Sequence, residues 1–289
     1  IYKYAILAPK ALSQVAKTVL SPVTHDRNFI TASVFAGANG AIFPSYGDVK
    51  MLAPKFLGGE GILSKAYDIT GKRVFGTMTK ADQELYERLL KVGVADSAIQ
   101  PGETKRLIKD VMSDPALAEK KVMRGLLNVP EKAQKIYGKV QDAYVAEDEF
   151  WKYITWNLER NRYENVLTSA GINKDNYLKI LSEESDMGKF LRKMTPRQEV
   201  AAESYQGFLD EIAGNLARNQ VPNYGYIGRT AKALRQSPFG NFISFPIEIV
   251  RTGNNIMSQA IDEITSGIPG VAAIGYRRLL SFGTTVGGI

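Results

Sequence analysis

The chain has 289 residues and a net charge of +7, and 44% of its residues are hydrophobic. Such a chain can bury a sizeable core, and its composition excludes global disorder. The absence of cysteine excludes disulfides and thiolate metal sites, and the single histidine, His25, excludes a site built from several histidines. The mild basic excess permits contact with nucleic acid or an anionic membrane surface but requires neither.

The first predicted region, residues 1–78, opens with apolar residues at helical spacing. Residues 29–43 are almost all apolar or small, a pattern typical of a buried core helix or a subunit interface. Small residues also mark helix packing in lipid, so a membrane-inserting segment is an alternative. The side chains that we expect to pack against another subunit or a membrane here are Phe29, Val34 and Phe35.

Residues 44–78 are interrupted by several prolines and glycines, which predict an irregular stretch. Within it, residues 66–77 favour a small hairpin around Thr70-Gly71-Lys72. The glycine cluster at 58–61 lacks the Gly-Lys-Ser/Thr ending of a phosphate-binding loop. We therefore expect no nucleotide site in this stretch.

The second predicted region, residues 79–220, reads as a helical body. Thr79 and Asp82 predict a capped helix start. Apolar residues at steps of three and four then predict one long helix around 130–170, which would measure about 60 Å. The acidic block Glu147-Asp148-Glu149 lies within it, and its neighbouring side chains point in different directions on a helix. We expect a solvated or subunit-facing acidic collar there, since a glycosidase needs two carboxylates flanking one bond.

The third predicted region, residues 221–289, holds a Pro/Gly-rich turn at 221–246 and apolar helices after it. Phe242 and Phe245 are candidates for packing against another subunit or a membrane. Cations in this region could contact DNA phosphates or lipid headgroups, which would be sequence-independent and salt-sensitive binding. These candidates are Arg229, Lys232, Arg235, Arg251, Arg277 and Arg278. A terminal helix packed on its own domain is the alternative for the last two.

The whole pattern predicts an all-α fold, an elongated multi-helix assembly in which helices follow one another with few other elements. The chain begins at Ile1 and ends at Ile289 with no polar tail, so we expect an excerpt of a longer polypeptide or a processed product.

Several segments together resemble a helical region of large polyvalent proteins of bacteriophages, which overlap with the internal virion, or ejection, proteins of short-tailed phages. The segments that carry this resemblance are KTVLSPVTH (17–25), GVADS (93–97), YVAEDEFWK (144–152), VPNY (221–224), PFGNFISFP (238–246), EIVR (248–251) and IGYRRL (274–279). They follow the chain in order and are specific as a set, although none is a catalytic signature.

This resemblance implies a structural virion protein that is packed inside the capsid near the portal and enters the host cell envelope on ejection. There it would help to form a conduit for genome delivery. The implied partners are copies of the chain in a ring or tube, other core or portal proteins, phage DNA without sequence preference and the host membrane. In that family a transglycosylase activity, where present, lies in a separate domain.

Two other function classes are open. A nucleic-acid-binding module of a large viral protein would show a contiguous basic face, but basic and acidic residues alternate along almost every predicted helix. A peptidoglycan-cleaving domain would need a buried glutamate facing a cleft, and no glutamate is distinguished by the sequence. We therefore expect a non-enzymatic protein with no catalytic residue, no cofactor and no bound metal.

Overall fold

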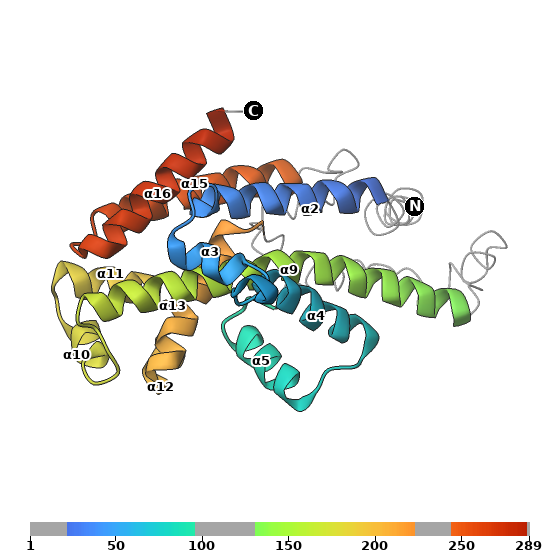
Figure 1. Ribbon diagram of the computed structural model, residues 1–289, viewed down its shortest axis with the longest axis horizontal. Coiled ribbons are helices and arrows are strands. Elements are labelled where there is room, and N and C mark those ends of the chain that lie inside the picture. The colour runs from blue at the N-terminus through green and yellow to red at the C-terminus, as the bar shows by residue number, and fades with distance from the viewer. Residues whose placement is uncertain (1–21, 96–130, 223–243, 288–289) are drawn as a thin grey trace, which may run out of the picture. The chain divides into compact units, whose positions relative to one another are not determined.

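The computed structural model describes residues 22–95, 131–222 and 244–287 (Figure 1). Within these ranges every regular element is helical, which confirms the predicted all-α class. The elements are α2 (Pro22–Ala36), η2 (Gly37–Ala41), α3 (Tyr46–Leu52), η3 (Lys55–Leu57), α4 (Ile62–Phe75), α5 (Lys80–Lys91), α9 (Glu131–Ser169), α10 (Tyr177–Ser182), α11 (Asp186–Met194), α12 (Gln198–Glu203), α13 (Tyr205–Gln220), α15 (Ser244–Ile264) and α16 (Pro269–Gly287).

The chain divides into two compact units, and neither is one continuous segment. The first unit comprises residues 1–30, 97–148 and 223–248, and the second comprises 31–96, 149–222 and 249–289. The three successive regions suggested by the sequence are 1–78, 79–220 and 221–289. Most of the first unit lies outside the described residues, so the fold below is that of the second unit.

The predicted long helix is confirmed as α9, which is 39 residues long. It ends as expected just before Gly171, whose φ of 78° suits a residue without a Cβ. The part of α9 in the second unit contributes to both large apolar clusters of that unit: Tyr153 and Trp156 to one, Tyr163 and Leu167 to the other. Steps of three and four thus place these side chains on buried faces of one helix, as the sequence pattern indicated.

Residues 44–78 are more ordered than the sequence suggested, because they contain α3, η3 and α4. The predicted hairpin at 66–77 is wrong, and most of this segment belongs to α4. Ile62, Ala66 and Ile69 are buried at helical spacing, so packing outweighs the turn signal of Gly71. A Cβ at Gly71 would meet nothing within 4 Å, which fits an exposed helix position.

Local capping signals mark several helix starts. Thr79 and Asp82 form the predicted reciprocal capping box at the start of α5. Ser45 and Asp48 form a second one at the start of α3. Because both side chains of each box satisfy backbone N–H groups, these starts are specified by residues within the first turn of each helix.

Helices α15 and α16 approach each other at Gly275. A Cβ there would lie 2.6 Å from the carbonyl oxygen of Ala260 and 2.9 Å from the Cβ of Glu263. We expect Gly275→Ala to lower the free energy of unfolding by about 2 kcal/mol, because the two helices must separate to admit the methyl group. Urea unfolding would measure the change.

Gly283 offers the matched control for that substitution. It lies in the same helix, and a Cβ there would meet nothing within 4 Å. Gly283→Ala should be neutral or stabilise by up to about 1 kcal/mol, since alanine is the better helix former. Equal effects at the two glycines would contradict the close approach.

Candidate functional site

The most unusual feature of the second unit is a group of charged side chains in its interior, here called the ion cluster. It consists of Asp48 from α3, Glu159 and Arg162 from α9, Glu263 from α15 and Arg278 from α16. Each of these side chains is at most 4% exposed. Buried charges on this scale are tolerated only when they are paired and hydrogen-bonded.

Arg278 is held by two glutamates. Its Nε and Nη2 donate to the two oxygens of Glu263 at 2.9 and 2.8 Å. Its Nη2 and Nη1 donate to the two oxygens of Glu159 at 3.0 and 3.1 Å. Nη1 also donates to the side-chain oxygens of Gln220 and Asn39 at 2.9 and 3.1 Å. The guanidinium therefore joins α16 to α9, α15, α13 and η2.

Arg162 makes the second half of the cluster. Its Nε and Nη2 donate to Asp48 at 2.8 and 3.2 Å, and its Nη1 donates to Glu159 at 2.8 Å. Nη1 also donates to the backbone carbonyl of Asn39 at 2.8 Å. The next residue, Gly40, has a φ of 94°, and this left-handed turn brings the carbonyl towards the arginine. Glu159 thus lies between two arginines and links them.

The charges of the cluster nearly cancel. Three carboxylates face two buried guanidiniums, and Arg277, whose side chain is 31% exposed, lies 3.6 Å from Asp48. Burial lowers the pKa of Arg278, but Glu159 and Glu263 outweigh it and hold that pKa well above its ordinary value. The hydroxyl of Tyr163 donates a hydrogen bond to Glu263 at 2.8 Å. Burial, the largest cause, and next the negative charge of Glu263 raise the pKa of Tyr163 well above its ordinary value. The cluster is therefore a closed, charge-balanced tie between helices, with its carboxylates already engaged.

Outside the ion cluster, another buried carboxylate, Asp210 of α13, also binds two arginines. Arg88 of α5 donates to it from Nε and Nη2, the shortest contact being 2.7 Å, and Arg160 of α9 donates from Nε at 2.8 Å. The guanidinium of Arg88 lies 5.8 Å from the ring centroid of Trp156, a cation–π distance. These contacts tie α5 and α13 to α9 in the same way as the ion cluster does for other helices.

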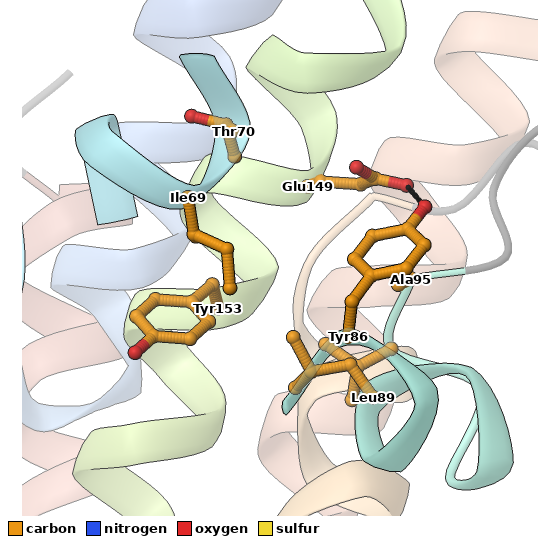
Figure 2. Close-up of a pocket in the computed structure, with 8 residues that line it drawn as sticks. Ile69, Thr70, Tyr86, Leu89, Ala95, Glu149 and Tyr153 are labelled. Atoms are coloured by element: carbon orange, nitrogen blue, oxygen red, sulfur yellow. Dashed lines mark hydrogen bonds between the residues drawn. The ribbon is translucent and has the colours of Figure 1, made fainter. Parts of the chain in front are cut away.

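A small pocket lies between α4, α5 and α9, beside the buried carboxylate of Glu149 (Figure 2). Tyr86 donates a hydrogen bond to Glu149 at 3.0 Å, and Arg73 donates to it at 2.7 Å. The remaining lining residues are Ile69, Thr70, Leu89, Val94, Ala95 and Tyr153. The cavity volume is about 10 Å³, which is room for one water molecule and far below that of a ligand site.

The position of Glu149 corrects the prediction of an acidic collar. Its side chain is 6% exposed and is paired with a cation of another helix, whereas Glu147 is half-buried. The side chain of Asp148 lies outside the described residues. Glu149 can be buried because Arg73 of α4 compensates its negative charge. The sequence pattern of α9 alone could not indicate this partner.

The candidate cations are only partly described. Arg229, Lys232 and Arg235 lie outside the described residues. Arg251 is half-buried in α15, and Arg277 is beside Asp48. Arg278 is fully buried and bound to two glutamates, so in this structure it has no surface on which to contact a phosphate. Arg278 therefore fits the alternative prediction, a terminal helix packed on its own domain, better than the prediction of a DNA or lipid contact.

The residues predicted to pack against another subunit or a membrane differ in how far their side chains are buried. Phe242 lies outside the described residues, and the side chain of Phe245 is likewise not described. Phe29 is 41% exposed and Val34 is half-buried. Phe35 is buried against Ala38 and Ile256, which makes it part of the interior of the second unit and not a surface for a partner.

Two further kinds of site have no candidate in the described part of the chain. None of its helices combines the length and apolar character needed to cross a bilayer. No group of three or more acidic or histidine side chains in the same residues could hold a metal ion. Comparisons with protein-family models, curated proteins and solved structures found no match for this chain.

Proposed function

We propose that this chain is part of a structural internal virion protein of a short-tailed bacteriophage, which assembles near the portal and helps to form a conduit for genome delivery. The sequence resemblance supports this proposal at the level of the family. The all-α fold, tied together by internal ion pairs, is compatible with it. The proposed partners are copies of the chain, other core or portal proteins, phage DNA without sequence preference and the host membrane.

The observation that carries an assembly role is a run of exposed large apolar side chains between residues 42 and 75. Phe56, Tyr46, Tyr67 and Phe75 are 84%, 87%, 77% and 72% exposed. Others in the same stretch are Ile42, Phe43, Val49, Leu57 and Leu63. Where such side chains form a contiguous surface, that surface typically binds another protein or a membrane.

The pairing of the arginines weighs against the nucleic-acid-binding alternative for the described residues. Arg88, Arg160, Arg162, Arg218 and Arg278 all make ion pairs with buried carboxylates. Non-specific DNA binding needs Lys and Arg side chains that can neutralise phosphates and thereby release the counterions condensed on the DNA. Cations that already neutralise internal carboxylates contribute little to such binding.

The test uses residues 1–289 and measures mass by light scattering, flotation with anionic liposomes, and DNA binding at several salt concentrations. We expect self-association or liposome binding, and weak DNA binding that falls with salt. Replacing Phe56 and Tyr67 by serine should reduce the association, whereas Lys174→Ala and Lys179→Ala on other exposed surfaces should not. A protein that stays monomeric and binds neither liposomes nor DNA would contradict the proposal, and so would release of peptidoglycan fragments.

A further inference from the structure

The turn between α3 and α4 presents two large apolar side chains to solvent. Phe56 and Leu57, which belong to η3, are 84% and 69% exposed and are here called the apolar tip. At this exposure they contribute little to the core of the second unit. Packing within the unit therefore does not explain why a phenylalanine and a leucine stand here.

The backbone of this turn closes on itself below the apolar tip. The N–H groups of Glu60 and Gly61 donate to the carbonyls of Lys50 and Ala53, each at 2.9 Å. A Cβ at Gly59 would lie 2.1 Å from the carbonyl oxygen of Ala53, so the two arms of the turn touch at this glycine. The tip is thus held in place by backbone contacts, and binding would not have to order its backbone first.

The charged side chains around the apolar tip are mostly basic. Between residues 49 and 65 they are Lys50, Lys55, Glu60 and Lys65, and all four are exposed. Three positive charges against one negative charge give this segment a net charge of +2. An apolar centre with a positive surround complements a surface that is apolar inside and anionic outside.

We infer that the apolar tip inserts into the interface of an anionic lipid bilayer, with Lys50 and Lys55 at the phospholipid headgroups. Apolar side chains gain free energy when they leave water for the acyl boundary, and each lysine nearby adds attraction to anionic lipids. Tyr46 lies one helical turn from Lys50 on α3 and is 87% exposed. Tyrosine is enriched at membrane–water interfaces, which agrees with this placement.

Two observations favour a bilayer over another protein as the partner of the apolar tip. The cations around the tip are all lysines, whereas protein interfaces are depleted in lysine and enriched in arginine. The tip also offers only two side chains on one short turn. A stable protein interface takes about 20–30 residues a side, whereas a bilayer accepts single side chains without a complementary surface.

This inference rests on the proposed function, because it names a lipid surface as the partner of part of the exposed apolar run. The sequence contains no cysteine, so Phe56→Cys can carry a single environment-sensitive fluorophore. With vesicles of phosphatidylcholine and phosphatidylglycerol, its emission should shift to the blue and be quenched by lipids with a nitroxide on the acyl chain. The same label on Leu178→Cys, a half-exposed leucine position on α10, should show neither change.

Two pairs of substitutions test the charge. Lys50→Gln with Lys55→Gln should weaken binding to these vesicles at least about tenfold, because each lysine near an anionic surface contributes about fivefold. Lys174→Gln with Lys179→Gln removes the same charge from other exposed positions and should change binding far less. Equal effects of the two pairs would overturn the inference, since binding would then follow net charge alone.

Phe56→Ser with Leu57→Ser tests the apolar tip and should also weaken vesicle binding at least about tenfold. Circular dichroism would check that this variant keeps its helices. Unchanged vesicle binding would overturn the inference, as would equal quenching of labels at Phe56 and Leu178 or a wild-type protein that binds no vesicles. If the variant loses only self-association, a second copy covers the tip and the inference is wrong. In each of these cases the proposed function still stands where the wild type self-associates or binds vesicles by another surface.

Discussion

Arg278→Met is expected to destabilise the second unit by about 4 kcal/mol. Methionine fills much of the same volume, so the main loss is the charge, which leaves Glu159 and Glu263 buried without their shared cation. Removing one partner of a buried ion pair is costly because the remaining charge is neither solvated nor neutralised. Urea unfolding followed by tryptophan fluorescence would measure the change, since both tryptophans, Trp151 and Trp156, lie in α9 and in this unit.

Two further variants separate the effect of charge from that of packing. Arg277→Met changes the neighbouring arginine, which is partly exposed, and should cost no more than about 1 kcal/mol. The double variant Arg278→Met with Glu263→Gln removes one of the stranded charges and should recover a substantial part of the loss. If Arg278→Met alone costs about as little as Arg277→Met, the ion cluster does not hold the helices together.

The sequence allowed the helical class and the longest helix to be predicted, because both depend on local signals. Helix α9 was visible from its apolar steps, its end from Gly171, and the start of α5 from Thr79 and Asp82. A capping box or a period of 3.6 residues is complete within a short window of sequence. Such features need no knowledge of which helices are neighbours.

The ion cluster could not be predicted, because its members come from distant parts of the chain. Asp48 and Arg162 are 114 residues apart, and Glu159 and Arg278 are 119 apart. The only local signal was the arginine pair 277–278 within an apolar segment. That signal suits a membrane interface or a buried ion pair equally well, and only the contact with Glu159 and Glu263 decides between them.

The error at residues 66–77 has the same origin. A glycine between short apolar runs favours a hairpin locally, yet Ile62, Ala66 and Ile69 find an apolar surface made by other helices.

Asp48→Asn is expected to lower the free energy of unfolding by about 3 kcal/mol at pH 7, because Arg162 loses one of its two buried counter-charges. Burial raises the pKa of Asp48, but Arg162 and the hydrogen bonds from Ser45 outweigh it and hold that pKa below its ordinary value of 3.8. A carboxylate with a lowered pKa in the folded state stabilises the fold above its unfolded pKa. This contribution should disappear as the pH falls from about 4 through the folded pKa.

The wild-type protein should therefore lose stability below about pH 4 more steeply than Asp48→Asn, so that the difference between the two narrows as the solution is acidified. Urea unfolding at intervals from pH 7 to pH 3 would measure this convergence. Asp175→Asn, an exposed position in the turn before α10, provides the control and should follow the wild-type curve at neutral pH. A constant difference between wild type and Asp48→Asn across this range would show that the Asp48 charge contributes nothing, and that the ion cluster stabilises the fold through its shape and neutral hydrogen bonds alone.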